Sequence, residues 1–73
     1  MSENTNKLII YTLPGCDVSE RAVSELRAEG IDFEERNVMR NQAWFDEAMA
    51  ISIFVPIVIR GGEVEIGWKG ATG

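Results

Sequence analysis

The strongest constraint on the fold of this chain is a change of apolar spacing at Pro14-Gly15. Before this break, residues 7–12 form an apolar, β-branched run of strand length. After it, apolar residues recur at the spacing of one helix face, namely Val18, Ala22, Val23 and Leu26. Gly30 then supplies a residue that favours a left-handed conformation, which is typical of a helix end. The sequence therefore predicts a strand, a tight turn and an amphipathic helix.

The remaining chain repeats this alternation of strand and helix. The pattern predicts strands over 31–38, 56–60 and 63–67, and a helix over 41–51 that Asn41 caps. The Gly61-Gly62 pair predicts a hairpin between the last two strands, and residues 68–73 show no clear element. The order is β-α-β-α-β-β, in which neighbouring strands around a helix are parallel. We therefore expect an α/β fold.

Size and charge limit the classes of function. A chain of 73 residues forms one domain, which we place at residues 7–73 after a flexible N-terminal leader at 1–6. The formal net charge of −5 argues against nucleic acid and against an anionic membrane surface as partners. There is no apolar run of about 20 residues and no secretory signal pattern, so we expect a cytoplasmic protein.

The chain contains no histidine and one cysteine. The missing histidine excludes Cys–His and Ser–His–Asp catalytic arrangements within one chain, and it disfavours a zinc site. A lone cysteine cannot form a disulfide within the chain, and it suits a reducing compartment. Chemistry at sulfur therefore depends on Cys16 alone.

Cys16 follows the Pro-Gly turn and opens the predicted helix. The free N–H groups at a helix N-terminus stabilise an anion, and the thiolate is the nucleophilic form of cysteine. Ser19, one turn later, can donate a hydrogen bond to that sulfur but cannot resolve a mixed disulfide. The competing interpretation is a small buried cysteine, which the position at the end of a strand makes less favourable.

Four segments and their spacing carry a resemblance to the glutaredoxins and their small thioredoxin-fold relatives. They are IIYTLPGC at 9–16 with the CDVS tetrapeptide, GIDFEERNV at 30–38, and VPIVIRGGEVEIGW at 55–68. The resemblance covers residues 7–70. It implies a three-layer thioredoxin-like fold, with the usual final helix short or missing.

The resemblance also implies a function and a set of site residues. Cys16 would attack a disulfide or a glutathionylated thiol, and the CxxS pattern with Ser19 resembles the monothiol branch, which uses glutathione. Pro56 would follow a cis peptide bond, and Val55 would offer its backbone to the glutathione cysteine. Tyr11 would lie close to the active site. The family often holds the γ-glutamyl group with Gly-Gly followed by Asp or Ser; this chain departs from that pattern, with Gly67 at the end of the last strand and Thr72 as the residue that could substitute.

Several departures from the family pattern keep other functions open. Asp17 places a negative charge beside Cys16, neither Thr12 nor Leu13 is basic, and Phe54 stands where Thr or Ser is common. The leading hypothesis is a thiol–disulfide oxidoreductase that acts with glutathione or protein disulfides. One alternative is a dimeric carrier of a [2Fe–2S] cluster held by Cys16 and glutathione; without a cluster we expect a monomer. The other is a redox-inactive interaction domain.

Two further readings stay open at this point. Ser19 fits either a natural monothiol motif or the replacement of a second cysteine. Trp68 fits either a lid over the hydrophobic core or a contact with a partner.

Overall fold

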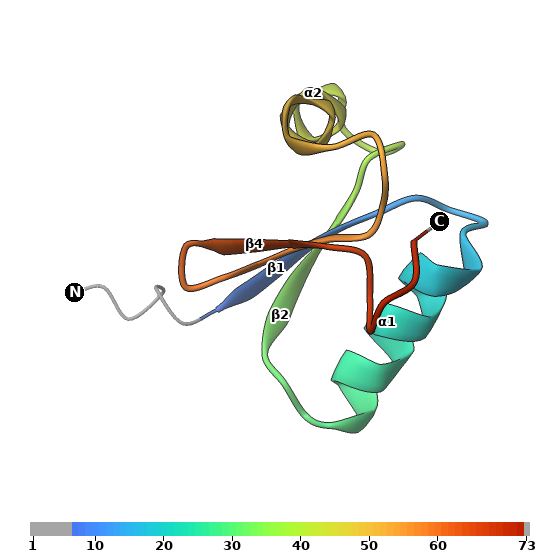
Figure 1. Ribbon diagram of the computed structural model, residues 1–73, viewed down its shortest axis with the longest axis vertical. Helices are drawn as coiled ribbons and strands as arrows, with labels where there is room; N and C mark the ends of the chain where they lie inside the picture. The colour runs from blue at the N-terminus through green and yellow to red at the C-terminus, as the bar shows by residue number, and fades with distance from the viewer. Residues whose placement is uncertain (1–6, 73) are drawn as a thin grey trace.

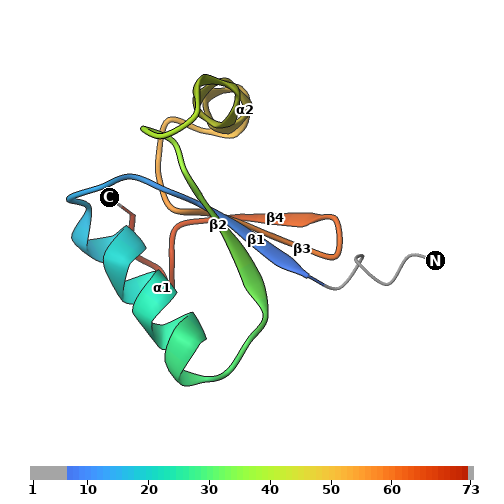
Figure 2. The same ribbon diagram turned by 180° about the vertical axis from the view of Figure 1, so that it is seen from behind.

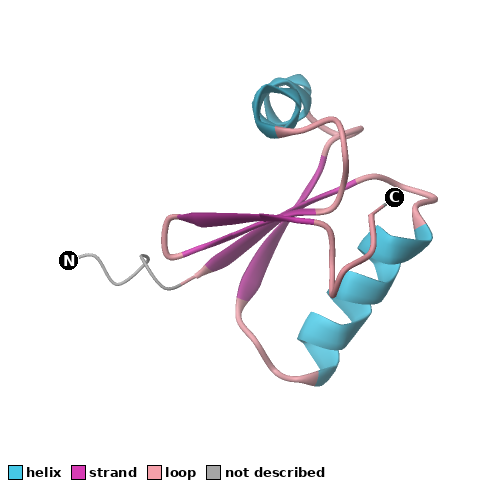
Figure 3. Ribbon diagram, viewed as in Figure 1, coloured by secondary structure: helices cyan, strands magenta, loops and turns pink. Residues whose placement is uncertain are grey.

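The computed structural model describes residues 7–72, so the predicted flexible leader at 1–6 lies outside the described residues. Six elements follow in the predicted order β-α-β-α-β-β (Figure 3). They are β1 (Leu8–Thr12), α1 (Asp17–Ala28), β2 (Phe33–Asn37), α2 (Gln42–Ile51), β3 (Ile57–Arg60) and β4 (Glu63–Ile66).

The four strands form one mixed sheet in the order β2-β1-β3-β4. β1 pairs in parallel with β2 across the α1 crossover, and in antiparallel with β3. β3 and β4 form the predicted hairpin. Both residues of its turn, Gly61 and Gly62, have positive φ values of 57° and 87°, which is the conformation that a two-residue hairpin turn requires.

The helices lie on opposite faces of the sheet, so the fold has three layers (Figures 1 and 2). The α1-side core contains Leu8 and Ile10 of β1, Val58 of β3, and Ala22, Val23 and Leu26 of α1. The α2-side core contains Tyr11, Val38, Ala48 and Ile57, with Trp44, Phe45 and Met49 packed against it. The alternation of strand residues between the two cores follows from the two-residue period of a strand.

Single residues mark the end of α1 and the start of α2, as the sequence predicts. Gly30, with a φ of 71°, follows α1 and donates its N–H to the Arg27 carbonyl at 3.1 Å. The Asn41 side chain accepts hydrogen bonds from the backbone N–H groups of Ala43 and Trp44 and so caps α2. Neither helix among residues 7–72 is long and apolar enough to span a bilayer.

Trp68 packs over the edge of the α1-side core. Its ring packs against that core, and its indole Nε1 donates to Glu25 Oε1 of α1 at 3.0 Å. Lys69 Nζ lies 2.7 Å from the same carboxylate oxygen. Between β4 and residue 72 the chain is not helical but forms a tight turn, in which Trp68 and Ala71 exchange backbone hydrogen bonds of 2.8 and 3.0 Å. Of the two interpretations of Trp68, the structure supports the core lid.

Candidate functional site at Cys16

A tight turn places Cys16 between β1 and α1. The Cys16 N–H donates to the Leu13 carbonyl at 3.2 Å, which closes a four-residue turn. Pro14 occupies the second position of this turn and Gly15, with a φ of 80°, the third. Proline followed by a residue with positive φ is the pattern of a type II turn. The turn therefore reverses the chain after β1 and places Cys16 at the start of α1.

Cys16 is the N-cap residue of α1. Its backbone is extended, with φ −91° and ψ 115°, and its carbonyl accepts the first helical hydrogen bond from Glu20 N at 3.0 Å. The thiol is free and partly exposed, and its side chain makes no capping hydrogen bond. Cys16 therefore lies at a helix N-terminus, whose unpaired N–H groups stabilise negative charge. The neighbouring Asp17 is exposed and carries a negative charge.

A cleft of about 440 Å³ opens beside the thiol. Its walls are residues 13–18 on one side and Ile53 and Val55 on the other. Val55 is buried and precedes a cis peptide bond to Pro56, as the resemblance implied. The cleft therefore brings the turn before α1 to the loop before β3, two segments that are distant in the sequence.

Ser19 lies on the inner face of α1, one turn after Cys16. It is 1% exposed, and its hydroxyl makes no hydrogen bond with any described residue. The expected hydrogen bond from Ser19 to the Cys16 sulfur is therefore not present in this structure. Ser19 lines a different cleft of about 380 Å³ between α1 and β2, together with Thr12, Glu35 and Asn37.

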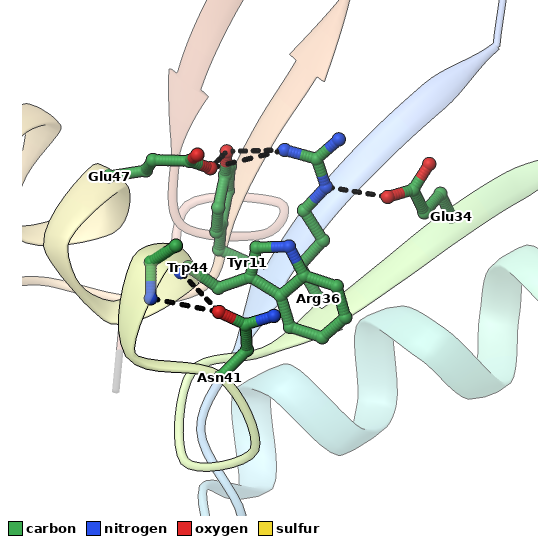
Figure 4. Close-up of polar contacts among 7 residues, drawn as sticks. Tyr11, Glu34, Arg36, Asn41, Trp44 and Glu47 are labelled. Atoms are coloured by element: carbon green, nitrogen blue, oxygen red, sulfur yellow. Dashed lines mark hydrogen bonds and ion pairs between the residues drawn. The ribbon is translucent and has the colours of Figure 1, made fainter.

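Tyr11 belongs to a polar cluster on the α2 face of the sheet (Figure 4). Its hydroxyl donates to Glu47 Oε1 at 2.8 Å and accepts from Arg36 Nη1 at 2.9 Å. Arg36 also pairs with Glu34 at 2.6 Å and with Glu47 at 3.2 Å. Burial raises the pKa of Tyr11 above its ordinary value, and the hydrogen bond to Glu47 raises it further.

The structure brings only some of the predicted site residues together. Cys16 and Val55 line one cleft, whereas Tyr11, Gly67 and Thr72 do not line it. The Gly67 N–H donates to the Pro56 carbonyl at 2.7 Å, and a side chain at Gly67 would overlap the Ala71 carbonyl oxygen. Gly67 therefore has a structural role in this turn, and binding of glutathione by these residues stays a prediction.

The residues that the structure describes do not form a metal site within one chain. Among residues 7–72 no group of three or more His, Cys, Asp and Glu side chains is placed to hold a metal ion. A [2Fe–2S] cluster takes four thiolate ligands, and the chain has one cysteine. A cluster would therefore need ligands from a second chain and from external thiols.

Sequence reasoning missed two walls of the cleft. Leu13 is 37% exposed and Ile53 is 74% exposed, although both are large and apolar. In the sequence, Leu13 stands out only as a departure from the basic residue of the family pattern, and Ile53 lies beyond the last helical position of α2. The sequence offered one signal for these two residues. Leu13 and Ile53 are apolar although neither belongs to a helical or strand period, and Ile53 lies two residues before Val55.

Comparisons with known proteins identify related sequences. A sequence model of the glutaredoxin family matches residues 8–65. The Gene 56 protein of Mycobacterium phage L5 is 36% identical over 52 residues, a stretch that covers 68% of this chain and 50% of that protein. The chain thus spans half the length of this curated relative.

A solved structure has the same fold. The crystal structure of a glutaredoxin from Archaeoglobus fulgidus superposes with a TM-score of 0.74 at 20% sequence identity. The match covers 94% of this chain and 86% of the archaeal chain. At this level of identity, the likeness establishes a shared fold.

Proposed function

The chain belongs to the glutaredoxin family, and from this premise we propose that it catalyses thiol–disulfide exchange through Cys16 alone. The observation that carries the proposal is the position of this thiol. Cys16 is free, partly exposed and at the N-cap of α1, and it faces an open cleft. A structural cysteine is ordinarily buried and inert, whereas Cys16 is partly exposed.

The exchange proceeds in two balanced steps. The Cys16 thiolate attacks one sulfur of a substrate disulfide, forms a mixed disulfide with it, and expels the other sulfur as a thiolate that takes up a proton. An external thiolate then attacks the substrate sulfur of the mixed disulfide, forms a disulfide with it and expels the Cys16 thiolate, which restores the free protein. Each cycle thus consumes one external thiol, which replaces the thiol expelled in the first step, because Ser19 cannot attack the mixed disulfide.

The residues around Cys16 have distinct roles in this proposal. The N-terminal N–H groups of α1 stabilise the thiolate, and the Val55 backbone next to Pro56 aligns the extended substrate. Glutathione, which the family generally uses, is the first external thiol to test. The location is proposed to be cytoplasmic, since a free thiol persists in a reducing compartment.

A comparison of two variants tests the proposal. Reduced protein is mixed with bis(2-hydroxyethyl) disulfide, a small neutral substrate, and the release of 2-mercaptoethanol is followed. We expect Cys16→Ser to reduce the rate to that of buffer. The control is Met39→Ser, which changes a 65% exposed side chain that does not line the Cys16 cleft, and we expect it to react like the parent protein.

Two outcomes would contradict the proposal. If the parent protein reacts no faster than free N-acetylcysteine at the same concentration, Cys16 is not an activated nucleophile, and the domain is better explained as an interaction module. If purification without oxygen in the presence of glutathione gives a coloured dimer that Cys16→Ser does not form, the cluster carrier becomes the better hypothesis.

A further inference from the structure

We propose that the Cys16 cleft selects disulfides carried by polypeptide segments and disfavours glutathione disulfide. In the favoured segments, the residues next to the disulfide are apolar, and any charge that they carry is positive. The inference rests on the proposed function and specifies its substrate class. It follows from two independent properties of the cleft, its apolar walls and the sign of its charge.

The walls of the cleft are apolar, and three of their apolar side chains are exposed, namely Leu13, Pro14 and Ile53. Leu13, Pro14 and Val18 line one side, and Ile53 and Val55 line the other. Ile53 is 74% exposed and therefore offers most of its side chain to a bound partner. Burial of apolar area contributes about 25 cal/mol per Å², so a partner that covers this surface gains affinity that a small polar disulfide does not.

The loop that carries Ile53 is held in place by local hydrogen bonds. The Ser52 N–H donates to the Ala48 carbonyl at 2.8 Å, which fixes the loop to the end of α2. The Ser52 hydroxyl accepts from the Phe54 N–H at 2.9 Å, which closes a turn around Ile53. Because the turn is already formed, binding against Ile53 costs little loop ordering.

The charge of the cleft opposes glutathione. Asp17 is the only charged residue that lines it, and none of its lining residues is Lys or Arg. Glutathione carries two carboxylates and one ammonium group, so each half of its disulfide is a net anion. The whole chain is also negative, with a formal net charge of −5. Like charges at short range lower affinity, whereas a neutral or basic segment meets no such repulsion.

A peptide series tests both properties in a single turnover. The substrates are symmetric disulfides of N-acetyl, C-amide tripeptides in which Cys is flanked by Leu, Ser, Lys or Glu, together with glutathione disulfide. Each is mixed with one equivalent of reduced protein, and the released thiol is followed. Each rate is divided by the rate of free N-acetylcysteine with the same disulfide, which removes differences in intrinsic reactivity.

The two properties predict separate effects. We expect the Leu-flanked disulfide to react about tenfold faster than the Ser-flanked one. We expect the Lys-flanked disulfide to react about threefold or more faster than the Glu-flanked one at low salt, and this ratio to fall as salt is added. Glutathione disulfide is expected to react at a rate close to that of the Glu-flanked peptide.

Two variants assign these effects to residues. Ile53→Ser is expected to remove most of the advantage of the Leu-flanked disulfide, while the matched control Met39→Ser preserves it. Asp17→Asn is expected to narrow the ratio between the Lys-flanked and Glu-flanked disulfides and to raise the rate with glutathione disulfide.

The outcomes separate this inference from the proposed function. If glutathione disulfide reacts as fast as the Leu-flanked peptide, or if Ile53→Ser leaves the Leu-to-Ser ratio unchanged, the inference is wrong although the exchange by Cys16 stands. If no disulfide in the series reacts faster than with N-acetylcysteine, the proposed function itself fails.

Discussion

Two buried hydroxyls, one on each side of the sheet, differ in their hydrogen bonding. On the α2 face, Tyr11 is 3% exposed, and its hydroxyl is hydrogen-bonded to Glu47 of α2 and Arg36 of β2. On the α1 face, Ser19 is 1% exposed, and its hydroxyl has no partner among the described residues. The polar contacts of Tyr11 therefore tie three elements together, whereas the Ser19 hydroxyl links α1 to no other element among the described residues.

The difference shows how each helix is held to the sheet. α2 combines a small apolar stripe with the Tyr11 cluster, in which Arg36 also lies 5.6 Å from the centre of the Tyr11 ring. α1 depends on apolar packing and on Trp68, which covers the core from the end of the described chain. The Lys69 hydrogen bond and then the Trp68 hydrogen bond lower the pKa of Glu25, so this carboxylate on α1 is held in its charged form.

The largest expected effect is therefore the loss of the Trp68 side chain. Trp68→Ala removes an aromatic ring from the α1-side core and the hydrogen bond to Glu25, and we expect it to lower the free energy of unfolding by about 3 kcal/mol. Trp68→Phe keeps an aromatic ring and should cost less. Urea unfolding followed by circular dichroism measures both. Equal stability of Trp68→Ala and the parent protein would mean that α1 does not depend on this lid.

A smaller loss is expected on the other face. Tyr11→Phe keeps the buried ring and removes only the hydroxyl that bridges Glu47 and Arg36. Hydrogen bonds to charged groups contribute about 1.5–3 kcal/mol, and Arg36 and Glu47 keep their direct contact at 3.2 Å. We therefore expect a loss of about 1–2 kcal/mol in the same urea experiment. A gain in stability would show that the Tyr11 hydroxyl is as poorly satisfied as that of Ser19.

The fold was predictable because its signals are local. Asn41 caps a helix, Gly61-Gly62 forms a hairpin, and Pro14-Gly15 makes a turn, each through the conformational preference of one or two residues. Once these residues have set where the elements begin and end, the spacing of the apolar residues within each element determines which faces pack against each other. The location of Cys16 at a strand-to-helix turn follows from the same local signals.

The walls of the site were not predictable in this way. Whether Leu13 and Ile53 face one cleft depends on the packing of α2 against the sheet, which no local pattern encodes. Tyr11 was expected near the site from the family resemblance, but the partners of its hydroxyl come from β2 and α2. The rotation of α1 about its axis, which buries Ser19 and leaves Val18 partly exposed, is likewise set by packing.

The smallest expected effect has the opposite sign and completes the comparison of the two faces. Ser19→Ala removes a buried hydroxyl that has no partner, and an unsatisfied buried polar group costs about 1–3 kcal/mol. Alanine is also the better helix former at this interior position of α1. We therefore expect the free energy of unfolding to rise by about 1 kcal/mol, measured beside Tyr11→Phe under identical conditions. A loss of stability in Ser19→Ala would show that the hydroxyl has a hydrogen-bond partner in solution, such as a bound water, and that the Ser19 and Tyr11 hydroxyls are both satisfied.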